Sequence, residues 1–148
     1  MDGNYYIDNN KKPLSDKCFF NISHSKNYVI FSFNKEYEIG IDIECIKNVN
    51  DGIIKYISNQ NELNYIYNND NDKDVSFLEI WTAKESLLKC IGKGINNHLK
   101  DINSLPLNSI KQYENEYFSC KTIKYDNCII SVTIKSNEDF KIEIVQEI

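Results

Sequence analysis

The sequence contains only two histidines, which excludes a metal centre built from several imidazoles. Its five cysteines are never arranged as CxxC, so they favour reduced, mostly buried thiols over a zinc site or a disulfide framework. The phosphate-binding patterns GxxxxGK[ST] and GxGxxG are absent, as is the nucleophile elbow GxSxG of serine hydrolases. These patterns of metal binding, phosphate binding and serine hydrolysis are therefore excluded, and candidate sites must be sought among other polar side chains.

Charge and hydropathy exclude further partners. The chain carries 17 Lys and Arg against 22 Asp and Glu, a net charge of -5, whereas nucleic-acid binding depends on cations that face phosphates. No run of about 18 apolar residues exists, and the first residues lack the basic-then-apolar order of a signal peptide. We expect a cytoplasmic protein with no nucleic-acid or membrane partner, folded as one domain over residues 1–148.

The hydrophobic period changes along the chain. Between residues 19 and 44 the short runs FFNIS, YVIFSF and EIGIDIE predict a three-stranded meander. Residues 51–90 show apolar positions at helical spacing, broken at NNDNDKD, and predict two or three helices. The runs YFSCKTIKY, CIISVTIK and FKIEIVQEI then predict a second antiparallel set. The expected fold class is α+β, with antiparallel strands flanking two or three helices.

The stretch EIGIDIE alternates isoleucines with acids. In a strand the isoleucines point to one face, expected to be core, while Asp42 and Glu44 point to the other. The acids could simply face water. Alternatively they hold Mg²⁺ or Mn²⁺, because two neighbouring carboxylates are unfavourable unless a cation or a proton compensates. Gly40 beside them would leave room for a ligand to approach the backbone.

A second candidate is the helical run WTAKESLLK. Glu85 and Lys89 lie four residues apart and share a face with Trp81. The simplest interpretation is a surface ion pair beside a core tryptophan. Lys84 lies on the neighbouring stripe and is expected to reach solvent or a second ligand group.

The third candidate is NISHS, at the expected junction of a strand and a turn. Ser23 and His24 could meet a phosphate there with a hydroxyl and an imidazole. A triad of Ser23, His24 and Asp42 is disfavoured, because adjacent residues of a strand point apart. His98 is expected to be an ordinary loop residue.

Taken in order, FNISHS, GIDIE and WTAKESLLKCIGKG resemble the 4′-phosphopantetheinyl transferase superfamily. Its signature is a G-[IV]-D-x-E strand followed by [FW]-x-x-K-E-[SA]-x-x-K, and here Glu85 follows Asp42 by 43 residues. The match runs from Lys12 to about Gly94 and is closer to the surfactin-activating type than to the short holo-acyl-carrier-protein synthase type, which lacks the histidine segment. The resemblance implies a 4′-phosphopantetheinyl transferase-like fold with a single half-unit.

The resemblance also implies roles for individual residues. Asp42, Glu44 and Glu85 would hold Mg²⁺, or Mn²⁺, against the pyrophosphate of coenzyme A. The residues assigned to coenzyme A are His24, Ser23, Lys12, Pro13, Lys84 and Lys89. The implied reaction transfers 4′-phosphopantetheine to a serine of an acyl or peptidyl carrier protein and releases 3′,5′-ADP. Glu85, or a water it holds, would be the general base, and Lys89 would neutralise phosphoryl charge.

Two alternatives to the transferase stay open at this point. The chain could be a non-catalytic module that binds coenzyme A or a carrier protein, or a Mg²⁺-dependent phosphodiesterase in which water attacks. Surfactin-type enzymes consist of two similar halves, and only 39 residues precede Gly40 here. The resemblance therefore implies that the N-terminal half is absent. The protein could be a remnant or a partner subunit, but we expect a homo-oligomer in which a second copy supplies the missing wall of the coenzyme site.

Overall fold

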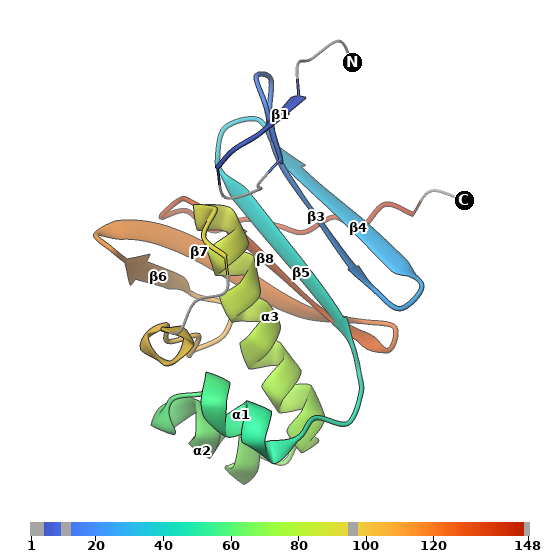
Figure 1. The fold of residues 1–148 in the computed structure, drawn as a ribbon, viewed down its shortest axis with the longest axis vertical. Helices are drawn as coiled ribbons and strands as arrows, with labels where there is room; N and C mark the ends of the chain where they lie inside the picture. Colours follow the sequence, from blue (N-terminus) through green and yellow to red (C-terminus); the bar gives the residue numbers. More distant parts are fainter. Residues whose placement is uncertain (1–4, 10–12, 95–97, 147–148) are drawn as a thin grey trace.

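The computed structural model describes residues 5–9, 13–94 and 98–146 and is built around a four-stranded antiparallel sheet. The sheet has the order β5-β8-β7-β6, formed by Ile39–Cys45, Cys128–Ile134, Glu116–Tyr125 and Ile110–Tyr113. The long helix α3 (Lys73–Ile91) lies across the sheet, and a hairpin of β3 (Phe19–Ser25) and β4 (Tyr28–Asn34) lies beside β5 (Figure 1). The remaining elements are β1 (Tyr5–Ile7), β2 (Pro13–Ser15), α1 (Asp51–Ile57), α2 (Gln60–Asn68) and the 3-10 helix η1 (Leu99–Asp101). The predicted α+β class is confirmed.

Polar residues at the helix ends explain where the three helices begin and stop. Asn50 and Asp72 cap α1 and α3 by accepting hydrogen bonds from first-turn N–H groups. Asn59 and Glu62 form a capping box at the start of α2. Gly92 ends α3 with a φ of 80°, a left-handed conformation that costs glycine little. The expected break at NNDNDKD is confirmed, because α2 ends and α3 begins within it.

Two predicted strand arrangements are wrong. β3 and β4 pair with each other, but β5 pairs with β8, so the expected three-stranded meander does not form. The C-terminal run FKIEIVQEI forms no strand over its described residues 140–146. Instead Phe140 and Ile142 pack as loop residues on the sheet, and Ile110–Tyr113 pairs with β7 as the edge strand β6.

β3 and β5 are joined through side chains. Alternate side chains of β3 accept hydrogen bonds from backbone N–H groups along β5, in place of backbone carbonyls. These bonds join Ile41 to Asn21 at 3.0 Å, Ile43 to Ser23 at 3.3 Å and Cys45 to Ser25 at 3.1 Å. We call this set the side-chain seam. It satisfies buried donors that would otherwise be costly.

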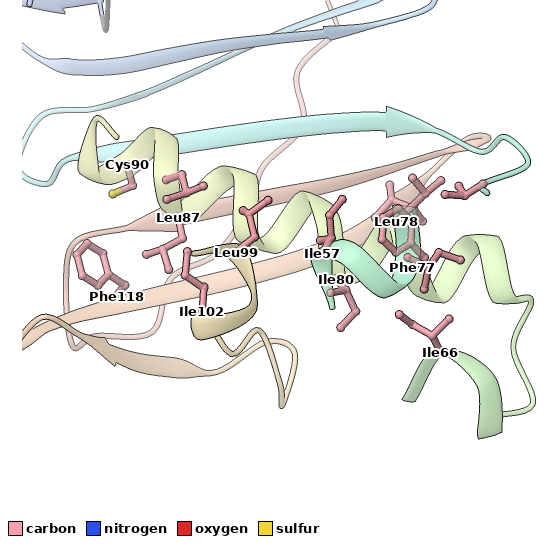
Figure 2. Close-up of a cluster of buried hydrophobic side chains, with 14 residues drawn as sticks. Ile57, Ile66, Phe77, Leu78, Ile80, Leu87, Cys90, Leu99, Ile102 and Phe118 are labelled. Carbon is pink, nitrogen blue, oxygen red and sulfur yellow. The ribbon is translucent and has the colours of Figure 1, made fainter. Parts of the chain in front are cut away.

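Both faces of the central sheet are covered. On one face, α1, α2, α3 and η1 bury a cluster that includes Ile54, Ile66, Leu78 and Phe118 (Figure 2). On the other face, the isoleucines of β5 pack with residues of β8 beneath the β3–β4 hairpin. The apolar row of EIGIDIE is therefore core, as predicted. None of the helices in the described residues is both long and apolar enough to cross a membrane.

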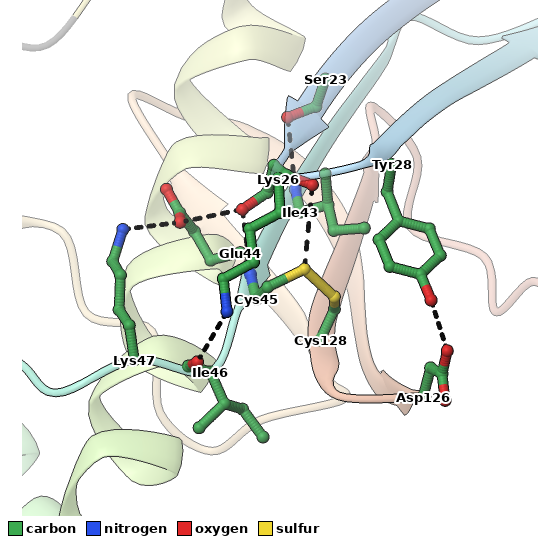
Figure 3. The surroundings of a disulfide bond; sticks show 11 residues. Ser23, Lys26, Tyr28, Ile43, Glu44, Cys45, Ile46, Lys47, Asp126 and Cys128 are labelled. Atoms are coloured by element: carbon green, nitrogen blue, oxygen red, sulfur yellow. Dashed lines mark hydrogen bonds and ion pairs between the residues drawn. A yellow bond between two sulfur atoms is a disulfide. The ribbon is translucent and has the colours of Figure 1, made fainter.

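The expectation of five reduced cysteines is wrong for one pair in this structure. Cys45 and Cys128 form a disulfide, because they lie directly opposite each other at the ends of β5 and β8 (Figure 3). The other three cysteines keep their thiol groups: Cys90 and Cys120 are buried, and Cys18 is half-buried.

Candidate active site

The polar row of β5 faces helix α3. The two elements approach closely at Gly40, where a Cβ would lie 2.0 Å from the backbone oxygen of Ser86 and 2.4 Å from the backbone nitrogen of Cys90. The expectation that Gly40 leaves room for a ligand is therefore wrong, because that space is filled by the helix. This close contact brings the acids of β5 beside the KESLLK segment.

Asp42 is buried in the contact between β5 and α3, with 5% of its surface exposed. Its Oδ1 accepts hydrogen bonds from Lys89 Nζ at 2.6 Å and from Ser23 Oγ at 3.0 Å. Its Oδ2 is also buried but has no hydrogen-bond partner among the described residues. Burial raises the pKa of this carboxyl, and the bonds from Lys89 and Ser23 only partly oppose the shift.

Glu85 reaches the same place from the helix. Its Oε1 is buried and, within the described part of the chain, has no hydrogen-bond partner. Burial, and then the nearby charge of Asp42, raise the pKa of Glu85 to about 7. Two adjacent carboxylates thus each carry a buried oxygen with no donor, an arrangement that calls for a proton or a cation.

Glu44, the third predicted ligand, lies nearer the surface. Its Oε2 is 2.9 Å from Lys47 Nζ (Figure 3), and its charge adds to the rise in pKa of Asp42 and Glu85. As placed, the described histidine, cysteine and acidic side chains form no group of three that could hold a metal. The predicted metal triad therefore stays a prediction. An all-oxygen donor set with two unpartnered oxygens nevertheless fits Mg²⁺.

Lys89 and Ser23 are both hydrogen-bonded to Asp42. Lys89 Nζ donates to Asp42, to Ser23 Oγ at 3.1 Å and to the carbonyl of Ile41 at 3.2 Å, while 29% of its side chain stays exposed. Ser23 is buried and donates a hydrogen bond to Asp42. In this structure both residues hold the carboxylate, and their predicted contacts with coenzyme A stay predictions.

His24 lies on the other side of β3. It pairs in register with Val29, whose side chain is 75% exposed, and His24 is itself exposed. Ser23 and His24 therefore point apart, as the alternation of a strand requires. Of the other residues predicted to bind coenzyme A, Lys12 lies outside the described residues and Pro13 is described only as part of the backbone of β2.

The expectation that Lys84 reaches solvent is wrong. Its side chain is fully buried and forms a 2.6 Å ion pair with Glu62, whose side chain is also fully buried. Burial lowers the pKa of Lys84, and Glu62 opposes that shift. We assign Lys84 no contact with coenzyme A. Sequence reasoning missed Glu62, although the N-x-x-E capping box at residues 59–62 was a visible signal.

Fold and site together define an α+β protein in which carboxylates and a lysine meet between the edge strand of a sheet and a long helix. A family model described as the 4′-phosphopantetheinyl transferase superfamily matches residues 38–145, which include β5, α3 and the four-stranded sheet. The chain belongs to this superfamily.

Curated relatives also carry the name 4′-phosphopantetheinyl transferase. The 4′-phosphopantetheinyl transferase gsp of Aneurinibacillus migulanus is 36% identical over 111 residues, which are 71% of this chain and 46% of the relative. Sfp of Bacillus subtilis strain 168 is 38% identical over 98 residues, 66% of this chain and 40% of the relative. HetI of Nostoc sp. PCC 7120 is 29% identical over 139 residues, 87% of this chain and 59% of the relative. The chain thus spans less than half the length of the first two.

Proposed function

We propose that this chain transfers 4′-phosphopantetheine from coenzyme A to a serine hydroxyl of an acyl or peptidyl carrier protein and releases 3′,5′-ADP. The observation that carries the proposal is the pair of buried, unpartnered carboxylate oxygens on Asp42 and Glu85, held beside Lys89. Such a cluster suits a reaction in which negative charge on a pyrophosphate must be neutralised. Membership of the superfamily supports the same reaction.

In this proposal Asp42, Glu44 and Glu85 hold Mg²⁺, with Mn²⁺ as a substitute. When bound, the metal would neutralise phosphoryl oxygens of coenzyme A. Glu44 can join the other two because it is the most exposed of the three and its partner Lys47 lies at the surface. Ser23 and Lys89 keep Asp42 in place meanwhile.

The chemical step exchanges one bond to phosphorus for another. The serine oxygen forms a bond to the phosphorus that carries the pantetheine arm, and the bond from that phosphorus to the bridging oxygen breaks. Glu85, directly or through one water, accepts the serine proton; its raised pKa of about 7 suits a proton acceptor near neutral pH. Lys89 neutralises charge on the departing 3′,5′-ADP. His24, Lys12 and Pro13 are proposed to bind the nucleotide end of coenzyme A.

The proposal includes a homo-oligomer. Its support is an apolar face of the β3–β4 hairpin that the described residues leave uncovered, which we call the outer face. Its exposed apolar residues are Ile22 (46%), Val29 (75%), Phe31 (58%) and Phe33 (60%). Exposed apolar groups gathered on one face mark an association surface, and His24 lies at its end.

Sedimentation over a concentration series, with and without coenzyme A and Mg²⁺, tests the assembly. Association should strengthen with coenzyme A, and specific activity should fall when the protein is diluted below the association constant. A monomer whose specific activity does not change with dilution would contradict this part of the proposal.

The central experiment measures the intact mass of an apo carrier protein after incubation with coenzyme A, Mg²⁺ and this chain. A gain of one phosphopantetheine arm is expected from wild-type protein, and from Glu114→Gln as a control for an exposed glutamate paired with Lys93 at the surface. Glu85→Gln should give no gain. Binding of coenzyme A without transfer would support a binding module instead, and hydrolysis of coenzyme A without transfer a phosphodiesterase.

A cytoplasmic location is the last part of the proposal. Cytosolic proteins are kept reduced, so Cys45 and Cys128 would then be thiols in the cell. Alkylation of protein in fresh extracts should modify all five cysteines after unfolding. Protection of two of them would argue for an oxidising compartment.

A further inference from the structure

The buried ammonium of Lys84 is satisfied by three acceptors from three segments. Its Nζ donates to Glu62 Oε2 of α2 at 2.6 Å, to the carbonyl of Ile57 at the end of α1 at 2.9 Å, and to the carbonyl of Leu99 in η1 at 2.7 Å. An ammonium group has three donors, so each finds one partner. A single side chain of α3 therefore binds α1, α2 and η1 together.

Glu62 extends this network. Its Oε1 accepts hydrogen bonds from the backbone N–H of Ser104 at 2.9 Å and from its hydroxyl at 2.8 Å, and its Oε2 accepts from the N–H of Asn59 at 2.9 Å. The carboxylate is thus fixed by the start of α2 and by the loop after η1. The partners of Lys84 are therefore two backbone carbonyls and a carboxylate that is itself fixed by three hydrogen bonds.

The position of Lys84 on α3 matters for the site. Lys84 precedes Glu85, and consecutive residues of a helix point about 100° apart. Lys84 therefore binds Glu62 of α2, while Glu85 lies on the side of Asp42. Gly40 already sets the distance between α3 and β5, because backbone atoms meet there. Buried hydrogen bonds to β8 also hold α3 on the sheet, and Lys84 restrains the rotation of α3 from the side of α1, α2 and η1.

We infer that Lys84 is a positioning residue: its buried bonds to Glu62, Ile57 and Leu99 set the rotation of α3 that points Glu85 and Lys89 at Asp42. The inference rests on the proposed function, because it explains how the proposed metal ligands are aligned. It predicts that loss of these bonds weakens metal binding and slows the chemical step more than it weakens the binding of coenzyme A, whose nucleotide end is proposed to be bound by other residues.

The test must separate positioning from stability. Lys84→Met alone leaves Glu62 as an uncompensated buried charge and is expected to fold poorly. The double variant Lys84→Met/Glu62→Gln removes both charges and keeps an amide oxygen for Ser104, so it should fold. A core variant, Ile66→Ala, serves as the destabilised control, because Ile66 is a buried apolar residue of α2.

Mn²⁺ affinity, kcat and the KM for coenzyme A are measured for each folded protein well below its unfolding temperature. The double variant should bind Mn²⁺ about 10-fold more weakly and lose about 10- to 100-fold in kcat, with a smaller rise in KM. Ile66→Ala should match wild type in all three.

Equal values for the double variant and Ile66→Ala would overturn the inference and leave Lys84 a stabilising residue only. If the wild-type protein binds Mn²⁺ but transfers nothing, the proposed function fails, and the Mn²⁺ affinities alone decide the positioning role. If the wild-type protein binds no Mn²⁺, the metal site and the positioning role both fall.

Discussion

Replacing Gly40 with alanine would place a methyl group where the backbone of α3 now runs. The new Cβ would lie 2.0 Å from the carbonyl oxygen of Ser86, and ordinary contact begins at 3.4 Å, so the helix would have to withdraw by about 1.4 Å. Both of the nearest groups, on Ser86 and Cys90, are backbone atoms. No side-chain rotation can relieve the clash.

The expected cost follows from the same geometry. Overpacking of a core costs about 1–3 kcal/mol, and a clash with backbone should reach at least the upper end, about 3 kcal/mol. For a chain of this size that corresponds to a fall in Tm of about 6–12 °C. The shift of α3 would also stretch the 2.6 Å contact between Lys89 and Asp42, so transfer activity should fall about 100-fold even where the variant is folded.

Urea unfolding and the transfer assay, both at a temperature where the variant is folded, measure the two effects. Gly94→Ala is the matched control, because a Cβ at Gly94 would meet nothing within 4 Å. A Gly40→Ala protein as stable and active as Gly94→Ala would show that β5 and α3 do not approach as described.

Further predictions concern the acids and the histidine. In metal-free protein the raised pKa of Glu85 means that the folded state favours the protonated carboxyl. The contribution of Glu85 to the free energy of unfolding is therefore fully present below pH 4.5 and is lost as the pH rises through about 7, by at most about 3 kcal/mol. Asp42, whose pKa is also raised, changes stability in the same direction. Urea unfolding at several pH values should show a flatter profile for Glu85→Gln, and an unchanged profile would refute the assignment. The same variant should stay folded yet lose transfer by intact mass. Asp42→Ala should lose activity that high Mg²⁺ partly restores; a defect insensitive to the metal would indicate structural damage. His24→Ala should raise the KM for coenzyme A more than it lowers kcat, whereas a fall in kcat alone would place His24 in the chemical step.

Periodicity in the sequence was a sound guide to single elements. The alternation of EIGIDIE showed which face of β5 is core, and the helical spacing after residue 51 predicted the helices, because both patterns report burial along one element. The partner of β5 could not be found this way. A strand buried on both faces can pair with any neighbour of similar period, and the pairing with β8 is decided by contacts between residues far apart in the chain.

The site shows the same limit. The signature predicts Asp42, Glu85 and Lys89 at one site; in the structure Lys89 bonds to Asp42, and the charge of Asp42 helps to raise the pKa of Glu85. The prediction that Lys84 reaches solvent is wrong because helical spacing shows which residues share a face but not what packs against that face. The group that packs against Lys84 is the carboxylate of Glu62, 22 residues earlier in the chain. Gly40 was misjudged for a related reason: a missing side chain makes space, and only the fold shows whether a ligand or a helix fills it.

The side-chain seam between β3 and β5 has a consequence for solubility. Exposed strand edges invite pairing with other molecules, and the N–H groups of Ile41, Ile43 and Cys45 form such an edge on β5. The hydroxyls and the amide of β3 occupy these donors without forming a backbone ladder. If the β3–β4 hairpin separated from β5, the exposed edge of this isoleucine-rich strand could pair with a strand of another molecule. The hairpin therefore protects the protein against aggregation.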